Sequence, residues 1–236
     1  MNVDLFGDGY GSVQYVSHMG SDLSVVNAAR VSFGAEKSEV DETDKKLINY
    51  LMKHNHSSPF EHCMITMKFV VPLFIRSQHH RHRTWAYNEI SRRYTSVDVK
   101  FYEPTKFRQQ HSSNRQASTD ELINPIVEYN TAGFPISTNA SELVKMHNSS
   151  SLKLFEKLLK AGVCREQARG VLPQNLYTQY FGTVSLHNLL KFISLRIHEG
   201  AQWEIQQVAK ACLKIAREHF PHSVDSYIQK NKLEIL

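Results

Sequence analysis

The sequence predicts an α+β fold, in which helices flank a mixed or antiparallel sheet within a single domain covering residues 1–236. Two observations lead to this fold class. Stretches rich in β-branched and aromatic residues are interspersed with segments whose apolar residues recur at helical spacing. The length of 236 residues favours one large domain, because domains commonly hold about 100 to 200 residues.

The N-terminal elements predict both strands and helices. Residues 3–20 indicate two short strands around a glycine turn. Residues 21–33 and 41–56 indicate helices, and the second has a capping residue, acids in its first turn and bases at its end. Residues 63–74 are nearly continuous in apolar residues, which is typical of a buried strand that ends at Pro72. These elements form the first part of the expected core.

The C-terminal elements follow a polar excursion at about residues 105–140. Pro125, Gly133 and Pro135 interrupt this segment, so we expect it to leave the core rather than to link two domains. Beyond it the pattern predicts a helix, a short helix, an extended segment and two final amphipathic helices, in the order 141–162, 165–172, 174–185, 186–200 and 201–220.

Charge and cysteine content limit the possible functions. Lysine and arginine exceed aspartate and glutamate by five, which favours an anionic partner such as a nucleotide, a cofactor phosphate, nucleic acid or a lipid headgroup. Cys63, Cys164 and Cys212 are widely spaced and suggest neither a disulfide framework nor a zinc ribbon. With no long apolar run and no signal-like beginning, the chain is expected to be cytoplasmic and not membrane-bound.

The stretch at residues 78–94 concentrates arginines and histidines beside one carboxylate, Glu89. Several guanidinium groups close together can hold phosphate oxygens in paired hydrogen bonds. The aromatic residues Trp85 and Tyr87 could stack on a planar heterocycle or fill core space. A solvated basic face and a surface for single-stranded nucleic acid remain alternative interpretations.

Histidines also gather between residues 54 and 82, which raises the question of a metal site. The neighbouring arginines would repel a dication unless carboxylates offset them, and Glu89 is the only acid between His62 and Val97. We therefore expect no metal.

Two further arginines, Arg169 and Arg196, lie on elements that we expect to be partly buried. A buried arginine without an anionic partner is unfavourable. For Arg196, an ion pair with Glu199 or Glu204 and a contact with an anion or heterocycle are both open.

The spacing within residues 81–95 resembles the signature of flavin-dependent thymidylate synthases. Arg81, His82 and Arg83 are followed by seven residues and then by Ser91. Further blocks resemble that family in the same order, at residues 27–33, 51–62, 168–181 and 195–207. The resemblance covers most of the chain, and the excursion at 105–140 looks longer than in compact members.

The resemblance implies the fold and the activity of that family. The activity is methylation of dUMP to dTMP with 5,10-methylenetetrahydrofolate as carbon donor, tightly bound FAD and NADPH as reductant, releasing tetrahydrofolate without an enzyme nucleophile. It also implies a homotetramer with active sites at subunit interfaces, a small-molecule substrate and no nucleic-acid partner.

The resemblance also implies roles for individual residues. Arg196 would be catalytic by facing the uracil ring and favouring loss of its N3 proton, and His56 would lie in the folate and nicotinamide region. The expected flavin contacts are Ser58, Arg81, His82, Arg83, Glu89, Ser185, Leu186, His187 and Lys191. The expected nucleotide contacts are Gln78, His79, His80, Arg81, Glu89, Ile90, Ser91, Arg92, Arg93, Arg169 and Arg196.

The chain departs from the family pattern at two places. Many members have an Asn-x-Arg triplet where this chain has residues 185–187, and Asn or His where it has Lys191. A histidine that is common four residues after the activating arginine is Gly200 here, with His198 nearby. A basic protein that binds single-stranded nucleic acid, and a flavin-binding protein with altered chemistry, therefore remain alternatives, and the preference between NADPH and NADH stays open.

Overall fold

The structure, a computed structural model, describes residues 1–91, 93, 99–115, 117–131 and 134–234. The chain divides into two compact units. Unit 1 comprises Met1–Val70, Ser77–Glu89 and Gln179–Leu236, and unit 2 comprises Val71–Arg76 and Ile90–Thr178. The single domain over residues 1–236 stays a prediction.

The strands alternate irregularly with the helices along the chain. The strands are β1 (Asn2–Asp4), β2 (Ser12–Met19), β3 (Met64–Pro72), β4 (Ala86–Glu89), β5 (Phe107–Gln110), β6 (Ser118–Ile123), β7 (Ile126–Thr131), β8 (Phe134–Asn139) and β9 (Tyr177–Ser185). The α-helices are α1 (Asp22–Arg30), α2 (Glu42–Lys53), α3 (Leu73–His79), α4 (Ala140–Lys160), α5 (Arg165–Ala168), α6 (Leu186–Arg196), α7 (Trp203–His219) and α8 (Pro221–Asn231). Short 3₁₀ helices are η1 (Val31–Phe33), η2 (Ser58–His62) and η3 (Arg169–Val171). No helix in the described ranges is both long enough and apolar enough to cross a membrane.

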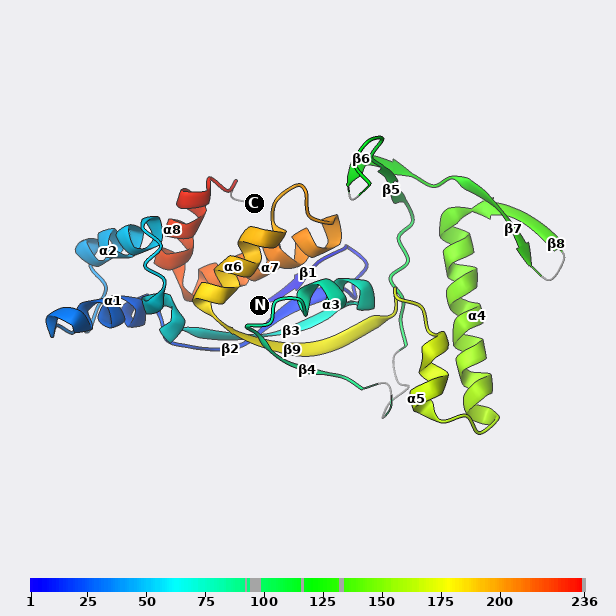
Figure 1. Ribbon diagram of the computed structural model, residues 1–236, viewed down its shortest axis with the longest axis horizontal. Coiled ribbons are helices and arrows are strands. Elements are labelled where there is room, and N and C mark those ends of the chain that lie inside the picture. The colour runs from blue at the N-terminus through cyan, green and yellow to red at the C-terminus, as the bar shows by residue number, and fades with distance from the viewer. Residues whose placement is uncertain (92, 94–98, 116, 132–133, 235–236) are drawn as a thin grey trace. The chain divides into compact units, whose positions relative to one another are not determined.

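A five-stranded sheet forms the centre of unit 1, in the order β1-β2-β3-β9-β4. The pairs β1–β2, β2–β3 and β4–β9 are antiparallel. Helices α6 and α7 lie along one face of this sheet (Figure 1). The predicted α+β class, with helices flanking a sheet, is confirmed.

Side chains of β3 show which face of the sheet belongs to the core. Ile65, Met67 and Phe69 are fully buried, whereas the residues between them are partly exposed. On that second face the hydroxyl of Thr66 is 2.9 Å from that of Thr183 on β9. The strand thus alternates between core and surface, instead of being buried on both faces as its apolar sequence suggested.

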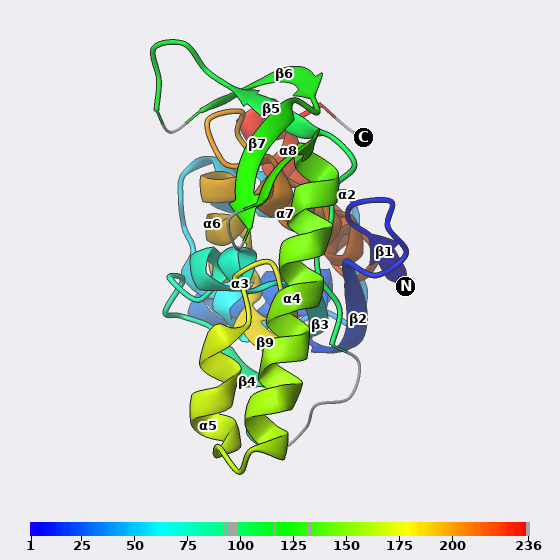
Figure 2. The same ribbon diagram turned by 90° about the vertical axis from the view of Figure 1, so that its right-hand side faces the viewer.

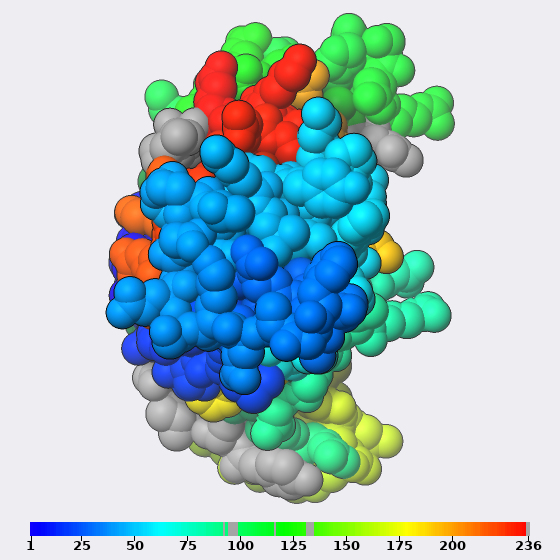
Figure 3. All heavy atoms as spheres, turned by 90° about the vertical axis from the view of Figure 1, so that its left-hand side faces the viewer, coloured from blue at the N-terminus to red at the C-terminus, as the bar shows by residue number. Residues whose placement is uncertain are grey.

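Helices α1, α2 and α8 pack together at one end of unit 1. Seen from that end, the blue spheres of α1 and α2 cover much of the surface and the red α8 lies above them (Figure 3). Helix α2 begins where the Asp41 carboxylate accepts the backbone N–H groups of Thr43 and Asp44, which is the capping that its sequence predicted. Helices α3 and α8 were not predicted. Because α8 follows α7 and buries Val224, Tyr227 and Ile228, the expectation that the helix at 201–220 is the last element of the core was wrong.

Unit 2 contains the long helix α4, the short α5 and two hairpins. Figure 2 shows α4 beside α5, and Figure 1 shows the hairpin of β7 and β8 at the N-terminal end of α4. The hairpins β5–β6 and β7–β8 account for most of the excursion at 105–140. The helix α4 ends before Gly162, whose φ of 89° suits glycine in a left-handed C-terminal turn.

Candidate functional site

Residues 80–85, which we call the signature turn, form a tight turn between α3 and β4. The hydroxyl of Tyr87 donates hydrogen bonds to the backbone carbonyls of His79 at 2.9 Å and His82 at 3.2 Å. The backbone N–H of His82 also donates to the carbonyl of His79 at 3.0 Å. Tyr87 therefore closes the turn from within, and the side chains of Arg81 and Arg83 are exposed.

His79 lies inside the core of unit 1. Its side chain is fully buried, its Nδ1 is 2.8 Å from the Tyr180 hydroxyl, and its ring packs against Phe69, Trp85 and Phe192. Burial holds the pKa of His79 well below its usual value. Electrostatic repulsion from His82, His80 and Arg196 lowers this pKa further. The ring is consequently neutral, and it packs against Tyr87, the residue that closes the turn.

His82 and Arg196 join the signature turn to the end of α6. The Nε–H of Arg196 donates to Nε2 of His82 at 3.1 Å, so this nitrogen carries a lone pair. The pKa of His82 is lowered to about 4, mainly by burial and then by the positive charges of Arg196 and Lys191. At neutral pH His82 is therefore a neutral acceptor that is influenced by two cations, Arg196 and Lys191.

The hydrogen bond of Arg196 goes to neither of the two partners that the sequence left open, an acid at Glu199 or Glu204 and a bound anion or heterocycle. The arginine is half-buried, as expected, and its hydrogen bond goes to His82. Arg169, by contrast, is exposed on η3, where its Nε donates to the carbonyl of Glu166 at 3.4 Å. The segment 165–172 is partly buried, as expected, at Ala168, Val171 and Leu172, but Arg169 itself is exposed.

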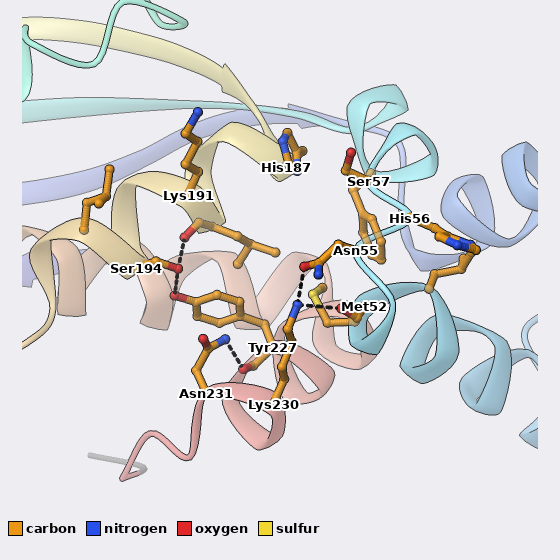
Figure 4. A pocket seen from close by; sticks show the side chains of 14 residues that line it. Met52, Asn55, His56, Ser57, His187, Lys191, Ser194, Tyr227, Lys230 and Asn231 are labelled. Carbon is orange, nitrogen blue, oxygen red and sulfur yellow. Dashed lines mark hydrogen bonds between the residues drawn. The ribbon is translucent and has the colours of Figure 1, made fainter.

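A pocket of about 560 Å³ opens beside α6 in unit 1. Figure 4 shows residues of α2, the following turn, α6 and α8 around it. Three residues that the resemblance singled out, His56, His187 and Lys191, line this pocket. The other lining residues are Leu51, Met52, Asn55, Ser57, Phe60, Leu190, Ser194, Leu195, Tyr227, Lys230 and Asn231. Apolar walls with lysines and histidines suit a ligand that has an apolar body and negative charge.

The triplet at residues 185–187 is held by Glu61. The hydroxyl of Ser185 donates to Oε2 of Glu61 at 2.5 Å and accepts the backbone N–H of Asn188 at 3.4 Å, which caps α6. Nε2 of His187 is 3.8 Å from Oε1 of Glu61. Ser185 and Leu186 are buried, so His187 is the member of this triplet whose side chain lines the pocket.

The remaining predicted residues lie in several places. In unit 1, Gln78 donates to the side-chain oxygen of Gln202 at 2.5 Å, and the ring of His80 stacks on Tyr87 at 4.0 Å. Ser58 is exposed at the start of η2, and Glu89 ends β4. Ile90, Ser91, Arg93 and Arg169 belong to unit 2. The hydroxyl of Ser91 accepts the backbone N–H of Arg93 at 3.2 Å, and Arg92 lies outside the described residues.

The cationic groups fit a flavin dinucleotide by the chemistry of their donors. Arg81 and Arg83 are exposed on the turn, and Lys191 and Arg196 lie near His82. A diphosphate needs N–H donors and positive charge, which these side chains supply. Within the described ranges no group of three or more His, Cys, Asp or Glu side chains is arranged to hold a metal ion.

The two buried cysteines, Cys63 and Cys212, are poor nucleophiles because burial keeps their thiols protonated. Burial raises the pKa of Cys63 to about 11 and raises that of Cys212 still further above its usual value. Both thiols therefore stay protonated at neutral pH, and a protonated thiol is a poor nucleophile.

Sequence reasoning missed Tyr87, Glu61, Tyr227 and Lys230 as parts of this site. Tyr87 was noted only as a ring that could stack. Glu61 lies within a block that resembles the family, although its contact with Ser185 spans 124 positions. No local pattern marked Tyr227 or Lys230, because α8 itself was not predicted.

Comparisons with known proteins agree on one family. A family model described as "Thymidylate synthase complementing protein" matches residues 14–222. A flavin-dependent thymidylate synthase from Thermus thermophilus is 43% identical over 213 residues, covering 89% of this chain and 73% of the relative. One from Thermotoga neapolitana is 40% identical over 219 residues, covering 93% and 91%. The crystal structure of the UMP/dUMP methylase PolB from Streptomyces cacaoi with 5-Br dUMP is similar, with a TM-score of 0.78, 29% identity and coverage of 96% and 97%.

Proposed function

This chain belongs to the thymidylate synthase complementing protein family, to which the flavin-dependent thymidylate synthases belong, and we propose from this premise that it methylates dUMP to dTMP. The carbon donor in this proposal is 5,10-methylenetetrahydrofolate, the reductant is NADPH and the product of the donor is tetrahydrofolate. When bound, FAD supplies the hydride chemistry that reduces the transferred one-carbon unit to a methyl group. The assembly is a homotetramer with active sites at subunit interfaces.

The contact between Arg196 and His82 is the observation that carries this proposal. It joins the signature turn to α6, and it is made by the Nε–H of Arg196. The four N–H bonds on the two terminal nitrogens can then serve an anion or a carbonyl. In the proposed reaction they face the uracil ring, where positive charge favours loss of the N3 proton and raises electron density at C5.

The other proposed contacts divide by ligand. For the flavin these are Arg81, His82 and Arg83 with Ser58, Glu89, Ser185, Leu186, His187 and Lys191. For the nucleotide they are Gln78–Arg81, Glu89–Arg93, Arg169 and Arg196, several of them from a neighbouring subunit. His56 serves the folate and nicotinamide region. The positive charge around the signature turn and the lysine-lined pocket support these assignments.

The experiment that tests the function combines spectroscopy with turnover. The purified protein should be yellow, with flavin near one per chain, and should convert dUMP only when flavin, the folate donor and a reductant are all present. A colourless protein that cannot be loaded with FAD would refute the proposal. Steeply salt-dependent binding to single-stranded oligonucleotides without a preference for dUMP would instead favour the nucleic-acid-binding alternative.

Arg196→Ala tests the catalytic role. The variant should keep its flavin absorbance and lose turnover on the order of 100-fold, because one transition-state contact is removed. Arg217→Ala is the matched control, since Arg217 forms an exposed ion pair with Asp225 on α8 and exposed pairs contribute little to stability. Equal turnover in the two variants would remove the proposed role of Arg196.

A further inference from the structure

Helix α8 connects two walls of the pocket through two side chains (Figure 4). The hydroxyl of Tyr227 is 2.7 Å from that of Ser194 on α6. The ammonium of Lys230 donates to the backbone carbonyl of Met52 at 2.7 Å and to Oδ1 of Asn55 at 2.6 Å. One side chain of α8 therefore holds α6, and the other holds the end of α2.

The turn that Lys230 holds contains a residue with a left-handed backbone, as many helix C-termini do. Asn55 has a φ of 58°, in the left-handed region that residues other than glycine seldom adopt. Since an ammonium group only donates, the atom of Asn55 that it contacts is the amide oxygen. A cation at the C-terminal end of α2 is also favoured by the helix dipole. Lys230 thus stabilises both the helix end and the left-handed residue after it.

The same turn leads directly into predicted ligand contacts. The backbone N–H of His56 donates to the carbonyl of Leu51 at 2.9 Å, which completes the turn that Asn55 begins. His56 and Ser57 line the pocket, and Ser58 follows at the start of η2. The direction of these three residues therefore depends on the conformation of Asn55.

We propose that Lys230 is a positioning residue, which by holding Asn55 in its left-handed conformation fixes the turn at residues 56–58 for the anionic co-substrate that binds beside His56. This inference rests on the proposed function for the identity of that co-substrate, a reduced folate or a nicotinamide dinucleotide. The ammonium of Lys230 donates to Met52 and Asn55 and not to Arg196, so we assign its role to the co-substrate side of the reaction.

Lys230→Met tests the inference, with Lys214→Met on the exposed surface of α7 as the matched control. In the flavin-loaded protein, backbone amide exchange at residues 54–58 should become about tenfold faster in Lys230→Met, because charge-assisted hydrogen bonds to the turn are lost. The KM for methylenetetrahydrofolate or NADPH should rise about tenfold, while the KM for dUMP and kcat stay within about twofold. Lys230→Arg, which keeps the donors, should restore most of the affinity.

The variant Asn55→Gly distinguishes an effect on the turn from a general loss of protein stability. Glycine adopts a positive φ readily but lacks the amide oxygen, so this variant breaks the bond to Lys230 without straining the backbone. It should reproduce a smaller rise in the co-substrate KM, and the double variant should be no worse than Lys230→Met alone.

Three results would overturn the inference. These are unchanged amide exchange in Lys230→Met, an equal rise in KM for all substrates including dUMP, or additive effects in the double variant. The amide-exchange measurement needs no turnover. If the wild-type protein fails to methylate dUMP, the proposed function fails while the effect of Lys230 on the turn is still decided.

Discussion

Replacing Arg196 with methionine should raise the pKa of His82. The donor and acceptor nitrogens are 3.1 Å apart, and two unit charges about 4 Å apart interact by about 1 kcal/mol in water and more in a partly buried site. About 1.4 kcal/mol corresponds to a tenfold change in proton affinity. We therefore expect the pKa of His82 to move from about 4 to about 5. It should stay below 6.5, because burial is the larger cause and is not removed.

The sign of the effect on stability follows from proton uptake. The unfolded chain binds a proton at His82 near pH 6.5, and the folded chain only near pH 4. Above about pH 6.5 this histidine therefore costs no stability. As the pH falls towards 4, the unfolded chain takes up a proton that the folded chain does not, so the free energy of unfolding decreases. The gap corresponds to at most about 3 kcal/mol, and screening by water at this partly exposed site lowers it to roughly 2 kcal/mol.

The assay compares pH dependence rather than absolute stability. Urea unfolding at pH 7 and pH 5 should show a smaller loss of stability in Arg196→Met than in the wild type, and NMR titration of the His82 ring should report the pKa directly. Lys191→Met is the control for general charge, since Lys191 has a weaker influence on His82 than Arg196 has. The reasoning is refuted if the pKa in Arg196→Met stays at about 4 or falls.

Two predictions concern the packing around the sheet and α8. Asp22→Ala should lower the free energy of unfolding by about 2 kcal/mol in urea denaturation, because its buried carboxylate accepts two backbone N–H groups of α8 and the hydroxyl of Ser223; a loss below about 0.5 kcal/mol would contradict this role. Gly20→Ala should lower Tm by several degrees, because the φ of Gly20 is +81° and an added Cβ would lie 2.9 Å from Sγ of Cys63. Gly7→Ala, with a φ of +69° and no atom within 4 Å, measures the backbone strain alone, so equal losses in the two variants would exclude the steric contribution.

The helices and strands that the sequence predicted correctly carry their own local signals. Helix α2 has its cap at Asp41 and acids in its first turn, and the β-branched residues of β9 mark it as extended. Helix α8 begins with Pro221, which suits a first helical position, but it has no capping side chain of its own, because its N-terminal donors are satisfied by Asp22 from the other end of the chain. The hairpins between 105 and 140 were missed because their sequence is polar and interrupted by proline.

The candidate site was predictable only in part for the same reason. The spacing from Arg81 to Ser91 is a local pattern, and it led to the family that the comparisons then showed. The partner of Arg196 is 114 positions away in the sequence, and no periodicity reports a contact of that kind. The role of Lys230 depends equally on tertiary packing, since its two acceptors lie near the end of α2.

The position of α8 also affects the order in which this protein can fold. The bonds from Lys230 to the α2 turn span 178 and 175 positions, and the contact of α8 with Asp22 spans 200. Contacts of such high contact order form slowly and late. During synthesis the bonds from Lys230 to the α2 turn therefore form only after α8 has left the ribosome. The β1–β2 hairpin needs only local contacts and can form before α8 is made, whereas the pocket lacks its α8 wall until α8 docks.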